Sequence, residues 1–217
     1  MNHKKICFII CVNHERYFEE CLYYLNHLWV PEGYEVEILA IREADSMAAG
    51  YNEGMRGTDA KYKIYMHQDV FIVNPNFLQE LLRIFEDDSI GMVGMIGSPK
   101  LPENAVMWFG ERIGAIYSND IVQSVIWLYN RGLCDVEAVD GLLIATQYDV
   151  PWREDIFTGW DFYDVSQSFE FRRKGYRVVV PDMKEPWCMH DDGFLKITDY
   201  NNARLKFLAE YGKKDNK

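Results

Sequence analysis

The segment KYKIYMHQDVFIV, residues 61–73, combines a β-strand pattern with the polar triplet His67-Gln68-Asp69. Residues 63–66 alternate polar and apolar side chains of β-forming types, which predicts a strand that ends at the triplet. Open α/β sheets bind ligands at the C-terminal ends of their strands. Because residues i and i+2 of an extended segment point the same way, His67 and Asp69 can meet one cation. A second explanation of the triplet is equally good. His67 would then be a buried, hydrogen-bonded histidine, and Asp69 would cap a turn.

The first half of the chain alternates strand and helix patterns around this segment. An apolar run such as residues 6–12 is typical of a strand that is buried on both faces of a sheet. Periodicity predicts further strands at 34–41 and 90–96, and helices at 15–29, 46–57 and 75–88. Four strands alternating with three helices predict right-handed crossovers and a doubly wound, nucleotide-binding half over residues 1–97.

The second half, residues 98–217, begins without the regular alternation of strand and helix patterns seen in the first half. Residues 98–114 contain two prolines and two glycines without clear periodicity, which predicts a long mobile loop that covers a site. Beyond it we expect strands at 123–129, 135–145 and 176–180, helices at 158–173 and 198–211, and a loop at 181–193. No linker divides the chain, so we expect a single domain with a shared core.

Composition and charge exclude several classes of function. The chain has 217 residues, is 48% hydrophobic and 26% charged, and can build one sizeable globular core. Its formal net charge of −11 argues against a nucleic-acid partner, because no basic stripe is present. The apolar run at 6–12 is too short for a signal peptide or a membrane span, so we expect a cytoplasmic protein. The five cysteines lack metal-type spacing and are expected to be reduced core or pocket residues.

One candidate site is a divalent-cation site. A diphosphate ligand on so acidic a protein needs a cation, because the few available arginines, such as Arg42 and Arg112, cannot neutralise it alone. His67, Asp69 and the distant His190 would supply the nitrogen and oxygen ligands that manganese accepts, with magnesium as the alternative. His190 lies in a loop pattern, residues 187–193, where a histidine is less easily explained as core.

Two further acidic motifs are candidates for chemistry. In the segment TGWDFYD, residues 158–164, Thr158 can cap a helix, and the spacing predicts Asp161 and Asp164 on one helical face. Either carboxylate could deprotonate an acceptor hydroxyl, or both could complement the helix dipole. Asp140-Gly141 is explained either by a turn or by a glycine that lets another chain or a ligand approach.

The tryptophans are concentrated in the second half of the chain. Of six, only Trp29 precedes the loop at 98–114. Their flat amphipathic rings suit the faces of sugars or an apolar acceptor, although several are expected in the core. The sequence contains no motif for several other kinds of active site. Residues 50–54 match neither a P-loop nor a dinucleotide-binding fingerprint, and the chain has no GxSxG sequence of the hydrolase type.

In this order the motifs resemble those of a known enzyme family. They are AGYNEG (49–54), HQDV (67–70), Asp140-Gly141, GWDFYD (159–164) and WCMHDDG (187–193). Nearly the whole chain resembles the nucleotide-sugar glycosyltransferases of the GT-A fold, in the family-2-like group and its streptomycin-biosynthesis StrF-type subgroup. The resemblance implies a mixed α/β sheet flanked by helices. It also implies transfer of a sugar, with inversion, from a nucleoside-diphosphate donor to a saccharide or other hydroxyl acceptor.

The resemblance also implies roles for individual residues. His67 stands at the first position of the usual Asp-x-Asp metal motif and Asp69 matches the second, while His190 resembles a late metal-binding histidine. Asp164 matches the catalytic base when counted back from Gly175, with Tyr163 in place of the usual glutamate; alignment on the Gly-Trp entrance favours Asp161 instead. The expected donor-binding residues are Cys11, Asn13, Arg42, Glu43, Asn52, His67, Asp69, Asp140 and Gly141.

The sequence leaves two alternatives to a glycosyltransferase. His67 and Tyr163 depart from the family pattern, which motivates a non-catalytic nucleotide-sugar-binding module of the same fold. Donor transfer or hydrolysis that depends on Asp164 would separate an enzyme from such a module. A nucleotidyltransferase is less favoured, because residues 12–16 lack the basic, glycine-rich loop that holds a triphosphate.

Overall fold

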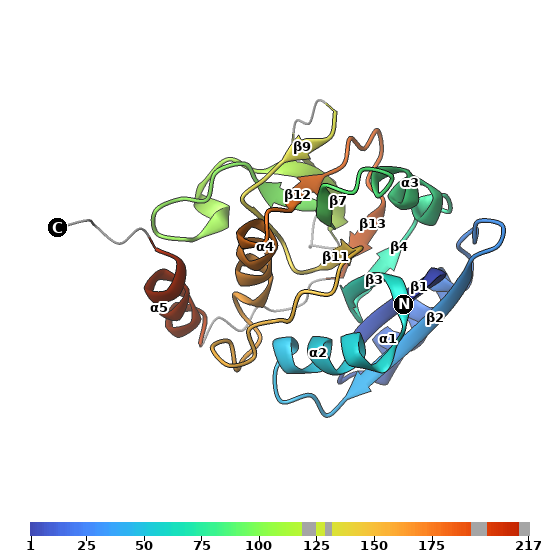
Figure 1. Cartoon of the computed structure of the whole chain (residues 1–217), viewed down its shortest axis with the longest axis horizontal. Coiled ribbons are helices and arrows are strands. Elements are labelled where there is room, and N and C mark those ends of the chain that lie inside the picture. The colour runs from blue at the N-terminus through green and yellow to red at the C-terminus, as the bar shows by residue number, and fades with distance from the viewer. Residues whose placement is uncertain (119–124, 129–131, 192–198, 213–217) are drawn as a thin grey trace.

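The computed structural model describes residues 1–118, 132–191 and 199–212, together with the backbone of residues 125–128. It contains α-helices and two mixed sheets (Figure 1). The helices are α1 (Glu15–Leu25), α2 (Met47–Gly57), α3 (Phe77–Ile84), α4 (Tyr163–Arg173) and α5 (Tyr200–Tyr211), with a 3-10 turn, η1, at Met107–Phe109. The strands are β1 (Asn2–Val12), β2 (Glu35–Arg42), β3 (Ala60–His67), β4 (Val70–Ile72), β5 (Ile90–Gly94), β6 (Ile96–Ser98), β7 (Ile113–Ser118), β8 (Val125–Leu128), β9 (Cys134–Asp135), β10 (Ala138–Val139), β11 (Leu143–Thr146), β12 (Arg177–Val180) and β13 (Cys188–His190).

The larger sheet joins the two halves of the sequence. Its strand order is β2-β1-β3-β11-β5-β12-β9. β1 pairs in parallel with β2 and β3, whereas β11 runs antiparallel between β3 and β5. The expectation of a doubly wound first half is therefore wrong in one respect, since a strand from the second half separates β3 from β5. The mixed sheet is confirmed, and the larger hydrophobic cluster contains residues from both halves of the chain. The single domain stays a prediction.

The smaller sheet brings distant segments together beside the polar triplet. It has the order β10-β6-β7-β13-β4, with β8 paired to β7. β13 lies antiparallel to β4, so that His190 is opposite Val70. Residues 61–73 are thus not one extended strand: β3 ends at His67, the chain turns at Gln68-Asp69, and β4 continues in the other sheet. The loop expected at 181–193 likewise contains a strand, and the strand expected at 135–145 is divided among β9, β10 and β11.

The N-terminal core has little room for larger side chains. Ile6 to Ile10 of β1 are at most 1% exposed, as expected for a strand covered on both faces. Helix α2 packs on β1 and β2. A Cβ atom at Gly54 would lie 2.3 Å from the Ile9 side chain, so the glycine permits this close approach. The AGYNEG motif is therefore in part a helix-to-sheet packing motif.

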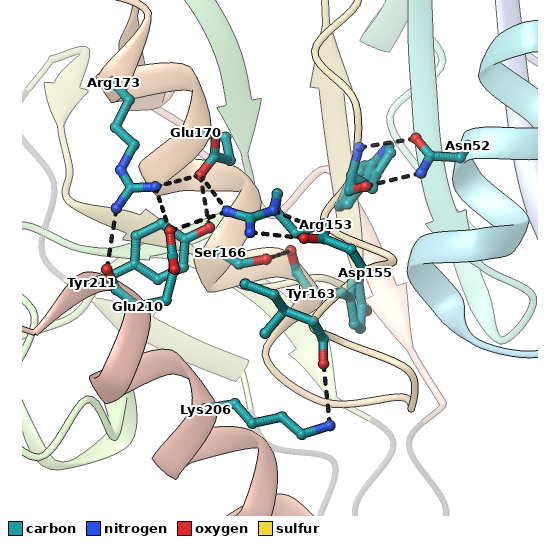
Figure 2. Close-up of polar contacts among 12 residues, drawn as sticks. Asn52, Arg153, Asp155, Tyr163, Ser166, Glu170, Arg173, Lys206, Glu210 and Tyr211 are labelled. Carbon is teal, nitrogen blue, oxygen red and sulfur yellow. Dashed lines mark hydrogen bonds and ion pairs between the residues drawn. The ribbon is translucent and has the colours of Figure 1, made fainter.

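Asn52 ties this helix to the segment before α4. Its side chain is 2% exposed, donates to the carbonyl of Trp152 (2.9 Å) and accepts from the Trp152 amide (2.9 Å) (Figure 2). The expected contact between Asn52 and a donor finds no support in this geometry, because both ends of the amide bind the backbone of the protein itself.

Asn52→Ala is expected to lower the free energy of unfolding by about 3 kcal/mol, since it leaves a buried N–H and a buried C=O unpaired. Urea denaturation measures the change. The matched control, Asn202→Ala on the exposed face of α5, should change stability by less than about 0.5 kcal/mol. Equal stability of Asn52→Ala and wild type would contradict the structural role.

The segment after β6 and the C-terminal helix form a second, smaller core. Ala105, from the segment after β6, and Phe207, from α5, are buried in this core. They lie there together with Phe157, Phe162 and Val165. The Ser98 hydroxyl donates to Lys100 O or Glu111 O (2.9 Å each), which closes the base of the loop at 98–114. The loop is therefore packed over part of its length, and its function as a lid stays a prediction.

A group of ion pairs holds α5 against α4 (Figure 2). Glu210 accepts from Arg153 (3.2 Å) and Arg173 (2.9 Å), and the Tyr211 hydroxyl donates to Glu170 (2.8 Å). Figure 1 shows this helix at the opposite end of the molecule from β2. Among the helices that the structure describes, none has the length and apolar character needed to cross a membrane.

Candidate active site

His67, Asp69 and His190 converge where the two sheets meet. His67 ends β3, Asp69 lies in the turn that follows, and His190 ends β13. Asp69 Oδ1 lies 3.9 Å from His67 Nδ1 and 3.6 Å from His190 Nε2. One candidate ligand atom from each residue lies within 4.8 Å of the others. The pairing of β13 with β4 accounts for the position of His190, which spacing in the sequence could not show.

The three side chains fit a divalent cation. Asp69 Oδ1 is buried and has no hydrogen-bond partner among the described residues. A buried carboxylate oxygen without a hydrogen-bond partner is costly, so the position is suited to a divalent cation. Two imidazoles and one carboxylate form a mixed nitrogen and oxygen set that Mn²⁺ accepts.

The electrostatics of the cluster give the protonation states that a metal ligand needs. Burial and the nearby His190 lower the pKa of His67 to about 4, and the attraction of Asp69 offsets this only in part. Burial alone would raise the pKa of Asp69, but His190 and His67 outweigh it and the pKa falls below its ordinary value. At neutral pH His67 is therefore a neutral imidazole and Asp69 a carboxylate.

Tyr163 contacts the cluster from the first turn of α4. Its hydroxyl lies 2.5 Å from His67 Nε2. A Cβ atom at residue 141 would lie 2.1 Å from the same hydroxyl, so only glycine leaves room for it. Gly141 therefore leaves room for the Tyr163 hydroxyl, so a side chain of the protein itself makes a close approach at this glycine. The contact of Gly141 with a donor stays a prediction. The departures of residues 67 and 163 from the family pattern were the only signal in the sequence of the contact between these two residues.

Asp164 lies in the same first turn and faces the Asp140-Gly141 segment. Its Oδ2 accepts a hydrogen bond from the Gly141 amide (2.9 Å). Asp140 Oδ1 accepts from the Leu142 amide (3.0 Å). Burial, and then repulsion by Asp140, raise the pKa of Asp164 to about 7. A carboxyl group of this pKa can exchange a proton near neutral pH.

Asp161 lies outside the helix that contains Asp164, since α4 begins at Tyr163. Phe162, the residue before α4, has a left-handed backbone conformation with φ of 61°. The expectations of a helix from residue 158, of Thr158 as its cap and of both aspartates on one helical face are therefore wrong. Asp161 instead lines a hollow of about 470 Å³ with the half-exposed Trp160 and with residues of α5. Burial and Asp199 raise the pKa of Asp161.

Gln68 links the triplet to the loop after β1. Its Oε1 accepts from the backbone amides of Asn13 (3.0 Å) and His14 (2.9 Å), and its Nε2 donates to Asn13 Oδ1 (2.5 Å). The middle residue of the triplet thus fixes the loop in which donor-binding residues were expected. Sequence reasoning assigned Gln68 no function, although its place between two candidate ligands was visible.

The remaining candidates for donor binding lie near this loop. Arg42, half exposed at the end of β2, forms two hydrogen bonds with Glu15 (2.8 and 3.0 Å), so its charge is already compensated. Glu43 is exposed and has a positive φ of 58°. Cys11 is 9% exposed, and burial raises the pKa of its thiol to about 12, so it is an unreactive core thiol. Their contacts with a donor stay predictions.

Comparison with known proteins matches most of the chain to one family. Residues 7–211 match the family described as "Glycosyltransferase like family". The sequence is 25% identical over 215 residues to the streptomycin biosynthesis protein StrF of Streptomyces griseus, covering 93% of this chain and 73% of StrF.

Solved glycosyltransferase structures share the fold at low sequence identity. The mannosyltransferase PcManGT of Pyrobaculum calidifontis, in complex with GDP-Man and Mn²⁺, has a TM-score of 0.58 and 12% identity, over 97% of this chain and 71% of that chain. TarS 1–349 of S. aureus, in complex with UDP-GlcNAc, has a TM-score of 0.64 and 9% identity, over 99% and 68%. A Drosophila β1,4-galactosyltransferase 7 mutant, in complex with manganese, UDP-Gal and xylobiose, has a TM-score of 0.53 and 17% identity, over 100% and 82%. The chain therefore has the GT-A fold and belongs to the glycosyltransferase-like family.

Proposed function

We propose that this protein transfers a sugar, with inversion, from a nucleoside-diphosphate donor to a saccharide or other hydroxyl acceptor. The observation that carries the proposal is the convergence of His67, Asp69 and His190 beside Tyr163 and Asp164, at the C-terminal end of β3. GT-A relatives with GDP-Man, UDP-GlcNAc or UDP-Gal bound support a nucleotide-sugar donor. We assign donor binding to residues 1–97 and acceptor binding to residues 98–217.

His67, Asp69 and His190 would hold a divalent cation, manganese or magnesium, as the complexes of two relatives with manganese suggest. When bound, the cation would supply positive charge against the diphosphate that leaves. The loop at Asn13, fixed by Gln68, and the end of β2 at Arg42 and Glu43 are proposed to bind the base and ribose. Asp140 is proposed to contact the donor sugar.

Asp164 is the proposed general base. Its carboxylate takes the proton of the acceptor hydroxyl while the acceptor oxygen forms a bond to the anomeric carbon. The bond from that carbon to the phosphate oxygen breaks, and the nucleoside diphosphate leaves with the electron pair. Asp161, which lies outside α4 and lines a hollow with residues of α5, is the weaker candidate for this step.

The rate of transfer is expected to depend on pH through Asp164. The base must be ionised, and its pKa is raised to about 7. At saturating substrate, kcat should therefore fall about tenfold for each pH unit below 7 and level off above it. A pH profile of kcat between pH 5 and 9 measures this. A rate independent of pH over the range 5 to 7 would contradict the assignment.

A thermal-shift screen of nucleoside diphosphates and their sugars, with and without Mn²⁺, tests donor binding. A ligand at about 100 times its dissociation constant stabilises the native state by about 2.7 kcal/mol. We expect one nucleotide to raise the midpoint in a metal-dependent way. If no nucleotide raises the midpoint of a cooperatively melting protein, the proposed function is wrong. Binding without transfer or hydrolysis would instead identify a nucleotide-sugar-binding module.

A further inference from the structure

The two positions at which this chain departs from the family pattern contact each other. By the family resemblance, His67 stands at the first acidic position of the metal motif, and Tyr163 stands in the place of the glutamate beside the proposed base. Although 96 residues separate them in sequence, His67 Nε2 and the Tyr163 hydroxyl lie 2.5 Å apart. A hydrogen bond therefore joins His67 and Tyr163, the two residues that depart from the family pattern.

The packing around Tyr163 fixes where its hydroxyl lies. The residue is 4% exposed, and its ring lies 5.8 Å from the ring of Tyr51 and 6.0 Å from that of Trp152. Gly141 leaves the space that the hydroxyl occupies. A side chain with so little freedom holds its partner in one orientation at little further cost in entropy.

The orientation of His67 has a consequence for the metal ligands. With Nε2 directed at Tyr163, the other ring nitrogen, Nδ1, is the one that faces Asp69 Oδ1, at 3.9 Å. An imidazole that binds a cation through Nδ1 carries its proton on Nε2 and donates it to a neighbour. The phenol oxygen of Tyr163 can accept a hydrogen bond from that N–H, and the Tyr163 O–H can donate one when Nε2 carries no proton.

We propose that Tyr163 is a positioning residue, which holds the His67 ring with Nδ1 toward the divalent-cation site and so allows histidine to serve where the family has an acid. This inference rests on the proposed function, because it concerns the same cation site. On this proposal, His67 and Tyr163 both belong to a working cation site, and their departure from the family pattern does not indicate that the site has been lost. Outer-sphere partners of this kind typically contribute about 10- to 100-fold to metal affinity.

Titration with Mn²⁺, followed by the electron paramagnetic resonance signal of the free ion, tests the proposal. Tyr163→Phe is expected to raise the dissociation constant about tenfold. Tyr51→Phe is the matched control: Tyr51 is a fully buried tyrosine in the same aromatic cluster, and its hydroxyl has no hydrogen-bond partner among the described residues. The control should bind Mn²⁺ within about twofold of wild type.

A double-mutant cycle shows whether Tyr163 acts through His67. In the His67→Ala background, Tyr163→Phe should change Mn²⁺ affinity no further, because the partner of the hydroxyl is gone. An equal loss in both backgrounds would mean a general packing effect and would overturn the proposal. So would unchanged affinity of Tyr163→Phe in the wild-type background, or a wild-type protein that binds no Mn²⁺.

A second measurement needs no metal. The ¹⁵N shifts of the His67 ring, identified by their absence in His67→Ala, report which nitrogen carries the proton. Tyr163→Phe should change them, and Tyr51→Phe should not; unchanged shifts in Tyr163→Phe would overturn the proposal. Failure of the proposed function has a different signature, because it would appear as the absence of nucleotide binding in the wild-type protein.

Discussion

Asp164→Asn is expected to lower kcat about 10³-fold while nucleotide binding stays within about twofold of wild type. General-base catalysis contributes typically about 10²- to 10⁴-fold, and an amide cannot accept the proton of the acceptor hydroxyl. The amide oxygen can still accept the hydrogen bond that the Gly141 amide donates to Asp164 Oδ2. The substitution therefore removes the proposed chemistry and preserves the local fold.

The same substitution should leave stability unchanged or increase it, with a defined pH dependence. Burial and Asp140 raise the pKa of Asp164 to about 7 in the folded protein, above its ordinary value of about 3.9 in the unfolded chain. The unfolded chain thus releases this proton at lower pH, and wild type loses stability as the pH rises from about 4 to 7. Asn carries no such proton, so its advantage should grow over this range and be complete above pH 7.

Asp161→Asn is the matched control, because Asp161 lies before the start of α4 and lines a hollow with residues of α5. It should retain kcat within about tenfold. Steady-state rates of donor turnover, nucleotide affinity and melting at pH 5 and pH 8 give the three readouts. A large loss of turnover in Asp161→Asn, with normal turnover in Asp164→Asn, would exchange the assignments of the two aspartates.

The elements that depend on local pattern were predictable from the sequence. The continuous apolar run of β1 indicated a doubly covered strand, and helical periodicity located α1, α2 and α3. The triplet after residue 66 could be placed at the ligand-binding end of the sheet because parallel strands present their C-terminal ends at one edge. His67 and Asp69 were accordingly found near each other, even though the chain turns between them.

The features that depend on tertiary contacts were not predictable in this way. The start of α4 is set by the left-handed Phe162, which is buried with Phe207 of α5, and a capping pattern at Thr158 could not reveal that. The insertion of β11 between β3 and β5 depends on pairing across the sequence. For the same reason spacing alone could not show that His190 or Tyr163 reaches His67.

Asp69→Ala is expected to weaken Mn²⁺ binding at least 100-fold and to abolish metal-dependent binding of the nucleotide donor. Asp69 is the carboxylate of the candidate ligand set, and its Oδ1 lies within 4 Å of both histidines. Without it, the candidate ligand set keeps two imidazoles and loses its carboxylate, the ligand that carries a formal negative charge.

The expected loss concerns binding, which separates Asp69 from Asp164 in function. Because His190 and His67 hold the pKa of Asp69 below its ordinary value, its carboxylate contributes stability at neutral pH, and Asp69→Ala is expected to lower stability modestly. The control is Asp59→Ala, because Asp59 is an exposed aspartate that forms an ion pair with Lys5. This variant should bind metal and nucleotide as the wild-type protein does. Calorimetric titration with nucleotide in the presence of Mn²⁺ measures the difference. If Asp69→Ala kept donor affinity and lost only turnover, while Asp164→Asn lost affinity, the proposed division between a metal-and-donor site and a base would be wrong.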